Sequence, residues 1–147
     1  MSHTFTIREG TIAEVVALSQ QIPEFSISYA AEEYHKRLKS ARHLILIAVD
    51  HQTPVGFKVG YQSADPTIFY SWMGGILPSH RRQKIAQHLA TYQEKWVKEN
   101  GFTHIRFKTR NYLKPMLIFG INNGFDIVEV IPKESVSNYR IILEKQL

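Results

Sequence analysis

A short basic segment, placed between an apolar stretch and an amphipathic one, is the part of the sequence best suited to bind a charged ligand. The apolar stretch ends at Pro78, and the helix that follows is expected to begin near Arg82. The first N–H groups of a helix have no partner within it, and together with the helix dipole they favour a phosphate or pyrophosphate. Arg81, Arg82 and Lys84 add three cations to the same turn. The segment therefore predicts an anion site, with a solvated basic loop as the alternative.

Two adjacent glycines, Gly74 and Gly75, interrupt the strand pattern just before this turn. Glycine weakens the interior of a strand and is typical of a bulge or of a close approach to the backbone. A bulge here would splay two neighbouring parallel strands and leave backbone groups free to pair with an extended ligand. A ligand with a pyrophosphate at one end and an amide-bearing arm at the other is coenzyme A. A plain bend in a long strand is the alternative.

The segment from Ile76 to Ala86 resembles the acetyl-CoA motif of the GNAT superfamily, a hydrophobic-x-Pro-x-x-Arg-x-x-Gly-x-Gly/Ala signature. Arg81 stands at the motif's Arg or Gln and Ala86 at its final Gly or Ala, whereas Lys84 replaces the first glycine. The resemblance implies that backbone N–H groups of the turn bind the pyrophosphate and that Ile76 and Leu77 offer backbone groups to the pantetheine arm. The predicted cofactor-binding residues are Ile76, Leu77, Arg81, Arg82, Gln83, Lys84, Ile85, Ala86 and Asn111.

The resemblance covers Val55 to Ile131 and includes features farther along the chain. Family members have an asparagine after the strand that follows the long helix, then another helix and a Gly-Phe pair; here Asn111 and Gly124-Phe125 match. The family often has a tyrosine four residues before that pair, as general acid for the departing thiolate. Gly120 occupies this position, so we assign no general acid; a thiol, with a pKa of about 8.5, is itself fairly acidic.

By this resemblance the chain is an N-acetyltransferase that moves an acetyl group from acetyl-CoA to a primary amine of a small molecule or peptide, directly within a ternary complex. A strand N–H near Gly75 or Ile76 would stabilise the oxyanion. Glu24, between the two N-terminal helices, is the candidate catalytic residue that binds the amine or relays its proton, with a solvated loop glutamate as the alternative. Tyr70 and Trp72 face either the acceptor or the core.

Hydrophobic periodicity predicts the elements that position these residues. Thr11 and Glu14 have the spacing of a capping box, Asn100-Gly101 is a helix stop, and Pro115 suits the first turn of a helix. The expected strands are residues 4–8, 44–49, 55–61, 67–77, 105–110, 125–131 and 139–143, and the expected helices are 12–22, 30–39, 82–99 and 113–123. This order predicts one α/β (α+β) GNAT-like domain over residues 1–147. Its central sheet is mixed and mostly antiparallel, with a splayed parallel strand pair and helices on both faces.

The composition narrows the class of protein. The 147 residues are 44% hydrophobic and 21% charged, which suits one globular domain. There are no cysteines, which excludes disulfides, a thiolate zinc site and a cysteine nucleophile. The longest apolar run, residues 44–49, is too short to span a membrane and the N-terminus lacks a signal-peptide layout, so we expect a cytoplasmic protein with no membrane partner. The seven histidines are scattered, so no metal is expected.

Two other function classes fit the formal charge of +5. A CoA-binding module without catalysis would explain Lys84 and the missing tyrosine. A nucleic-acid-binding domain would use the basic turn and the face formed by Arg106, Lys108 and Arg110, but no recognised nucleic-acid motif is present, so we expect no such partner. The sequence names neither the acceptor amine nor the oligomeric state, and a homodimer is compatible with it.

Overall fold

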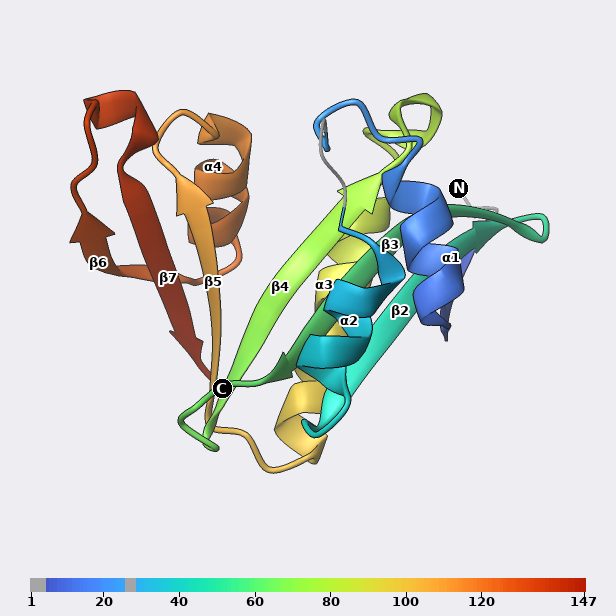
Figure 1. The fold of residues 1–147 in the computed structure, drawn as a ribbon, viewed down its shortest axis with the longest axis horizontal. Helices are drawn as coiled ribbons and strands as arrows, with labels where there is room; N and C mark the ends of the chain where they lie inside the picture. Colours follow the sequence, from blue (N-terminus) through green and yellow to red (C-terminus); the bar gives the residue numbers. More distant parts are fainter. Residues whose placement is uncertain (1–4, 26–28) are drawn as a thin grey trace.

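The computed structural model describes residues 5–25 and 29–147. Within these residues, seven strands form one sheet in the order β1-β2-β3-β4-β5-β7-β6, with helices on both faces (Figure 1). The strands are β1 (Phe5–Glu9), β2 (His43–Asp50), β3 (Thr53–Gln62), β4 (Ile68–Ile76), β5 (His104–Arg110), β6 (Asp126–Ile131) and β7 (Arg140–Gln146). The helices are α1 (Ile12–Ser19), α2 (Ala31–Leu38), α3 (Ile85–Glu99) and α4 (Lys114–Asn122), with 3-10 turns at Pro78–His80 and Val136–Asn138.

The element order confirms the predicted fold class. All neighbouring strands are antiparallel except β4 and β5, which are parallel. The predicted start of α3 near Arg82 is wrong: the helix begins at Ile85, because Arg82 and Lys84 have φ angles of 64° and 66°, which a right-handed helix excludes. The helix α1 ends at Ser19, and turns continue to Phe25. Thr4, the predicted start of the first strand, lies outside the described residues.

The helix α1 begins with the predicted capping box. Thr11 Oγ1 accepts a hydrogen bond from the Glu14 N–H at 3.2 Å, and Glu14 Oε1 accepts one from the Thr11 N–H at 3.0 Å. Arg8 on β1 donates to both carboxylate oxygens of Glu14. The start of α1 is therefore tied to the edge strand, and this fixes the direction of the segment that leads to Glu24.

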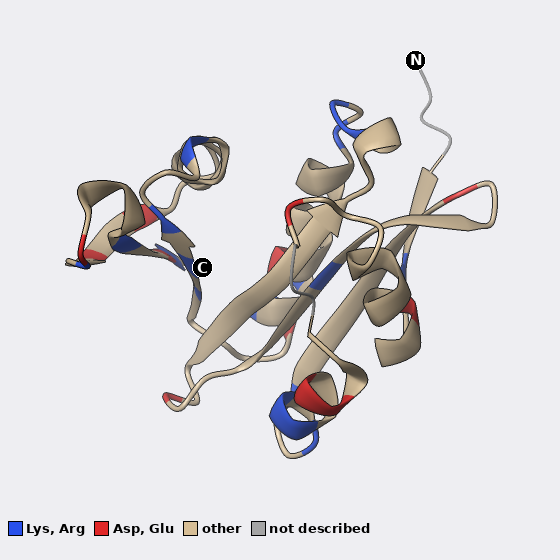
Figure 2. Ribbon diagram, turned by 45° about the horizontal axis from the view of Figure 1, so that its top comes forward, with Lys and Arg blue, Asp and Glu red and all other residues tan. Residues whose placement is uncertain are grey.

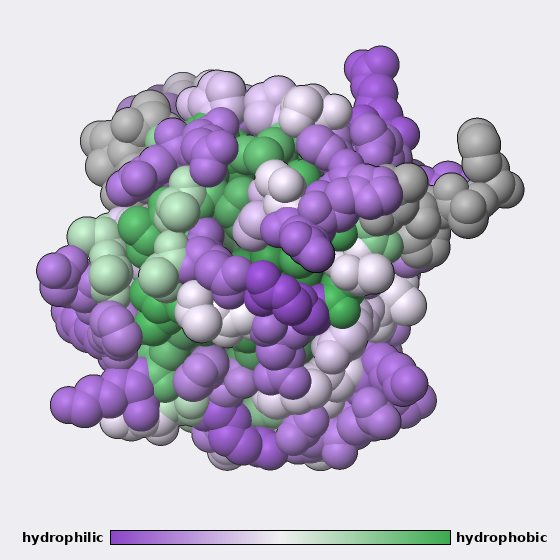
Figure 3. All heavy atoms as spheres, turned by 90° about the vertical axis from the view of Figure 1, so that its right-hand side faces the viewer, coloured by the Kyte–Doolittle hydropathy of each residue, from purple (hydrophilic) through white to green (hydrophobic). Residues whose placement is uncertain are grey.

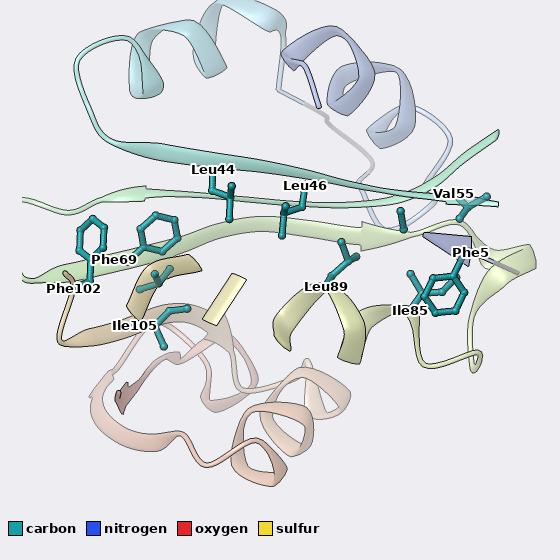
Figure 4. Close-up of a cluster of buried hydrophobic side chains, with 11 residues drawn as sticks. Phe5, Leu44, Leu46, Val55, Phe69, Ile85, Leu89, Phe102 and Ile105 are labelled. Atoms are coloured by element: carbon teal, nitrogen blue, oxygen red, sulfur yellow. The ribbon is translucent and has the colours of Figure 1, made fainter. Parts of the chain in front are cut away.

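One apolar core lies between the sheet and α3. Figure 4 shows side chains from the strands, from α3 and from the loop after it meeting in this core: Phe5, Leu44, Leu46, Val55, Phe69, Ile85, Leu89, Phe102 and Ile105. The helix α3 presents Ile85, Leu89, Gln93 and Val97 as its buried residues, at intervals of four. This spacing places a single stripe of α3 against the sheet.

The second apolar core lies on the opposite face, under α1 and α2. Leu18 from α1 and Tyr34 from α2 pack there with Ile47 and Phe57 from the sheet. The strand β2 has six consecutive buried residues, as predicted for a strand covered on both faces. The strands β1–β4 with α1, α2 and α3 therefore form a well-buried unit, which we call the N-terminal arm.

The strands β5, β6 and β7 with α4 form the C-terminal arm, which has a much smaller core. Its own core cluster, under α4, is built on three buried residues: Phe107, Ile141 and Leu143. Five of the six residues of β6 are exposed. Figure 1 shows this arm standing apart at the left, with β4 and β5 in contact at the bottom and diverging toward the top.

The outer side of the N-terminal arm, seen in Figure 3, is largely hydrophilic, with hydrophobic atoms visible between the polar side chains. None of the helices in the described part of the chain combines the length and the apolar character needed to cross a bilayer.

Candidate active site

The segment between β4 and α3 forms the predicted basic turn. After the 3-10 turn, Arg82 and Lys84 adopt left-handed conformations on either side of Gln83. None of the described side chains caps the start of α3, so the helix N–H groups from Ile85 onward lack a capping partner. Backbone turns of this kind direct N–H groups into a concave surface that suits an anion. Figure 2 shows basic residues on the turn before α3 and on the C-terminal arm.

Lys84 has a backbone conformation that favours glycine, the residue of the GNAT motif at this position. Its φ is 66° and its ψ is 16°, a conformation that glycine adopts freely and that costs a residue with a Cβ about 1 kcal/mol. The chain therefore keeps the backbone path expected at a glycine position, although the side chain is lysine. The substitution changes the local charge and conformational energy, and the turn retains its shape.

Two side chains hold this turn against the sheet. His80 Nε2 lies 2.8 Å from Asp50 Oδ2 at the end of β2, and Ser79 Oγ lies 2.8 Å from His80 Nδ1. Arg81 Nε donates to the Ile76 carbonyl at 3.1 Å, which closes the turn on itself. The turn is thus fixed relative to the end of β4.

Glu24, the candidate catalytic carboxylate, is bound by Arg81. The Arg81 guanidinium donates to both carboxylate oxygens of Glu24, at 2.8 and 2.7 Å, and this pair joins residues 57 positions apart. The hydrogen bonds from Arg81 lower the pKa of Glu24. The structure therefore places Glu24 at the basic turn and favours its ionised form, which makes it a weak proton acceptor.

The strands β4 and β5 separate after a short parallel contact. They pair only at Ile68–Tyr70 with His104–Arg106. The register of β4 against β3 then shifts: Met73 faces Val59 while Ser71 faces Gly60, so Trp72 is the extra residue of a bulge. The expected bulge and splay are both present, but the predicted position of the bulge at Gly74-Gly75 is wrong.

Packing accounts for Gly75 instead. A Cβ on Gly75 would lie 2.7 Å from Ile22 Cδ1 and 3.0 Å from Phe25 Cε2. The absence of a side chain there lets the segment after α1 rest directly on β4. This contact places the segment that carries Glu24 against β4, and it matches the close approach that a strand glycine can indicate.

The direction of the β4 backbone selects which groups face the splay. The Leu77 N–H donates to the Val55 carbonyl on β3 at 2.9 Å. Because successive residues of a strand point their N–H and C=O groups to alternate sides, Gly75 also points toward β3, whereas Ile76 and Gly74 point toward the splay. Of the two N–H groups predicted for the oxyanion, that of Ile76 therefore faces the splay and that of Gly75 is directed to β3. The Leu77 N–H, predicted to serve the pantetheine arm, is also directed to β3.

An aromatic cluster lines the α1/α2 side of the splay. The Trp72 ring lies 4.9 Å from the Tyr34 ring and 5.8 Å from the Tyr61 ring, between centroids. Tyr70 packs edge-on against Tyr61 at 5.5 Å. Burial raises the pKa of Tyr34 to about 12. Tyr70 and Trp72 remain partly exposed, so both of the roles considered for them, packing and facing the acceptor, are compatible with their positions.

At residue 120, where the family often has a tyrosine, neighbouring side chains occupy the space that a side chain would need. A Cβ on Gly120 would lie 2.6 Å from Phe107 Cζ and 3.2 Å from Leu143 Cδ2. Gly120 is the buried residue of α4, and the Phe107 ring takes the space next to it. The chain therefore has no room for a tyrosine at residue 120 while Phe107 stays in place.

Asn111, a predicted cofactor residue, follows β5 and connects the loops at the tip of the C-terminal arm. Its Nδ2 donates to the Val136 carbonyl at 3.1 Å, and its Oδ1 accepts from Lys114 Nζ at 3.0 Å. Its backbone N–H donates to the Tyr139 carbonyl at 2.9 Å. These contacts give Asn111 a structural role at the open end of the splay.

Three polar residues on the α3 side of the sheet were not predicted. Lys58 lies on β3 opposite Gly74, and its Cγ would lie 3.7 Å from a Cβ at that glycine. Burial lowers the pKa of Lys58 to about 8. Gln93 Nε2 on α3 and Thr109 Oγ1 on β5 are buried and, among the described residues, have no hydrogen-bond partner. The signal for Lys58 was a lysine within the strand segment Gly56-Phe-Lys-Val-Gly60.

In the parts of the chain that the structure describes, residues 5–25 and 29–147, no three His, Asp or Glu side chains gather in a way that could hold a metal ion.

Known structures share this fold. Ard1 from Thermoplasma volcanium superposes with a TM-score of 0.82 at 17% identity, over 99% of each chain. The ribosomal-protein-S18-alanine N-acetyltransferase from Escherichia coli gives 0.81 at 11% identity, over 97% of this chain and 93% of that one. PaiA N-acetyltransferase from Thermoplasma acidophilum, solved with coenzyme A, gives 0.73 at 17% identity, over 99% and 100%.

Comparison by sequence gives fewer matches than comparison by structure. Comparison with curated protein sequences gives no match. A profile of the Acetyltransferase (GNAT) family matches residues 13–118, which contain the basic turn, the β4 bulge and most of α4. The chain belongs to the GNAT acetyltransferase family.

Proposed function

We propose that the chain transfers an acetyl group from acetyl-CoA to a primary amine of a small molecule or peptide, directly within a ternary complex. The observation that carries this proposal is the meeting of two features. The end of β4, which has no strand partner on its β5 side, leads through the basic turn to the uncapped N-terminus of α3. One offers backbone groups to an extended arm and the other offers N–H groups to a pyrophosphate.

The residues present fit coenzyme A. The helix N–H groups from Ile85 and Ala86, with Arg82 and Lys84 beside them, suit the pyrophosphate. The PaiA N-acetyltransferase, which has the same fold, was solved in complex with coenzyme A, and this supports the choice of cofactor. Acetyl-CoA would supply the acetyl group as an activated thioester.

The reactants approach from opposite faces of the sheet. A ligand anchored at the start of α3 enters the splay from the α3 side, so the α1/α2 side is left to the amine. The Ile76 N–H then donates to a carbonyl oxygen placed in the splay as negative charge develops on it. Glu24 serves the amine as a charged partner rather than as a base, because the hydrogen bonds from Arg81 lower its pKa. No residue is assigned as general acid.

Thermal denaturation with coenzyme A tests cofactor binding. At 100 times the dissociation constant, binding stabilises the native chain by about 2.7 kcal/mol, which raises Tm measurably. The double variant Arg82→Glu, Lys84→Glu should weaken binding by on the order of 1–3 kcal/mol without unfolding the chain. Lys95→Glu, an exposed change within α3, serves as the matched control. Absence of any shift with millimolar coenzyme A contradicts the proposal.

A CoA-binding module without catalysis is the second candidate, favoured by Gly120 at the tyrosine position. Consumption of the thioester across a panel of amines separates the two: an enzyme releases free thiol in an amine-dependent way, and a binding module releases none. A cytoplasmic location, the absence of a nucleic-acid partner and the homodimer remain predictions from the sequence. The E. coli relative's name specifies a protein alanine, which makes peptides a reasonable part of the panel.

A further inference from the structure

Three basic side chains gather on the α1/α2 face of the C-terminal arm, next to the splay. Ile105 and Phe107 point into the cores on the other face, so alternation along β5 directs Lys108 and Arg110 to the α1/α2 face. Arg140 on β7 is the ladder partner of Arg110 and therefore shares that face. We call Lys108, Arg110 and Arg140 the cationic cluster.

The cationic cluster leans toward β4. Lys108 Nζ lies 5.3 Å from the centroid of the Tyr70 ring, at the point where β4 and β5 begin to separate. Burial and the neighbouring Tyr61 raise the pKa of Tyr70, and the positive charges of Arg37 and Arg140 oppose this shift. The cluster and the aromatic residues around Trp72 therefore border the same opening, on the side that the proposed function leaves to the amine.

The charges of the cluster are not neutralised by neighbouring acids. Two other cations on this side are paired: Arg106 with Glu144 at 2.6 Å and Arg37 with Glu33 at 2.7 Å. Among the described residues, no carboxylate forms an ion pair with the cationic cluster. Arg110 donates to a backbone carbonyl, that of Asn138, at 3.2 Å.

The acidic residues of this face have other partners or lie on the outer strand: Glu144 on β7 pairs with Arg106. By register, Asp126 and Glu129 on β6 share the face with Glu144 and Ile142 of β7, but β6 is the outer strand. The three cations of the cluster therefore adjoin one another on β5 and β7, with Glu144 and Glu129 as diagonal neighbours that form no ion pair with them. Like charges held together in this way repel each other, and a bound anion would offset that repulsion.

We propose that the acceptor molecule carries a carboxylate or phosphate group in addition to its amine, and that Lys108, Arg110 and Arg140 bind this group. The inference rests on the proposed function, because it takes the α1/α2 side of the splay as the amine's side. Two guanidinium groups on opposed strands present forked donors, which suit the oxygens of either anion. The anion anchors the molecule on the C-terminal arm while its amine reaches the strand opening.

Matched acceptor pairs test this inference with the full chain and acetyl-CoA. L-alanine is compared with L-alaninamide, and phosphoethanolamine with ethanolamine, so that each pair differs in the anion; the two pairs also separate carboxylate from phosphate. We expect kcat/KM to be at least about tenfold higher for the anionic member of one pair. In Arg140→Gln and Lys108→Gln this preference should fall through KM, with the neutral amine unchanged. Lys133→Gln, an exposed lysine outside the cluster, should retain it.

Calorimetric titration of the anionic amine into the CoA-loaded chain gives a readout independent of turnover, and binding should weaken in Arg140→Gln. Equal kcat/KM within both pairs, or a preference that survives in Arg140→Gln, overturns the inference. If neutral amines are acetylated well in that case, the proposed function stands and only the anionic acceptor is lost. If no amine is acetylated and coenzyme A gives no thermal shift, the proposed function falls as well.

Discussion

The two arms of the sheet differ in how they are built. In the N-terminal arm, β2 is buried along six consecutive residues between α3 on one face and α1 and α2 on the other. In the C-terminal arm, β6 is almost wholly exposed and the core consists of a few residues under α4. Three residue pairs of β4 and β5 join the arms. The difference teaches that one arm supplies most of the stability while the proposed site lies where the two arms part.

Truncation of a buried aromatic residue should show the largest contrast between the arms. Phe57 is fully buried in the N-terminal arm, so Phe57→Ala should lower the free energy of unfolding by about 3–5 kcal/mol. Val130→Ala on the exposed β6 should change it by less than about 0.5 kcal/mol. Urea denaturation of both variants measures this. A comparable loss from Val130→Ala would mean that β6 is covered in solution, as in a dimer.

Binding of coenzyme A should reveal a difference between the two arms in hydrogen exchange. If the C-terminal arm opens by itself, the amides of β5 and β7 exchange with solvent through that opening rather than through global unfolding. A ligand that needs both arms should then protect them by up to about 2.7 kcal/mol at 100 times its dissociation constant. Hydrogen exchange of the free and the CoA-loaded chain measures the effect. Equal protection of β2 and β7 in the free chain would contradict separate opening of the arm.

Burial of Lys58 on β3 should lower the stability of the N-terminal arm at pH 7. Its pKa is about 8 in the native chain and about 10.4 when unfolded. Between these values the unfolded chain binds more protons, so the free energy of unfolding should rise as the pH increases from 8 toward 10. Lys58→Met should remove this rise and stabilise the chain at pH 7 by on the order of 2 kcal/mol, allowing for partial exposure.

The measurement for Lys58 is denaturation of both proteins between pH 7 and about 9.5, below the range in which tyrosines titrate. Tyr34, with a pKa of about 12, has the opposite effect above pH 10, because the unfolded tyrosine loses its proton first. Parallel pH profiles for Lys58→Met and the unmodified chain would show that Lys58 is solvated.

The smallest expected effect lies at the basic turn between β4 and α3. Lys84→Gly relieves a left-handed conformation and should raise the free energy of unfolding by up to about 1 kcal/mol, with part of the gain offset by the entropy of the unfolded chain. Lys95→Gly, within the right-handed α3, should lower it by about 1 kcal/mol. Opposite signs in thermal denaturation support the backbone argument. Coenzyme A affinity should be retained in Lys84→Gly if the backbone governs binding.

Local signals in the sequence predicted much of the fold. The capping box of Thr11 and Glu14, the apolar β2 and the basic turn depend on neighbouring residues, and the structure has all three. Features that depend on distant partners were not predicted. The bulge lies at Trp72 because register against β3 decides it, and Gly75 is explained by Ile22 and Phe25.

In the candidate site, too, features that depend on distant partners were not predicted from the sequence. The Arg81–Glu24 pair spans 57 residues, and Arg140 joins Arg110 only through the strand ladder. Neither pairing has a pattern in the linear sequence, because each depends on how the sheet is assembled. The start of α3 was missed for a local reason: helical periodicity does not report the sign of φ at Arg82 and Lys84.

The contact between Gly120 and Phe107 also constrains how this chain can change by mutation. A side chain at residue 120 collides with the Phe107 ring, so a tyrosine there requires a smaller residue at 107 first. That first step opens a cavity in the small core of the C-terminal arm, where little stability is in reserve. The two positions are therefore mutually dependent, and neither order of single substitutions passes through an undamaged intermediate. A lineage that has reached the Gly120–Phe107 combination is thus held in it by its own packing.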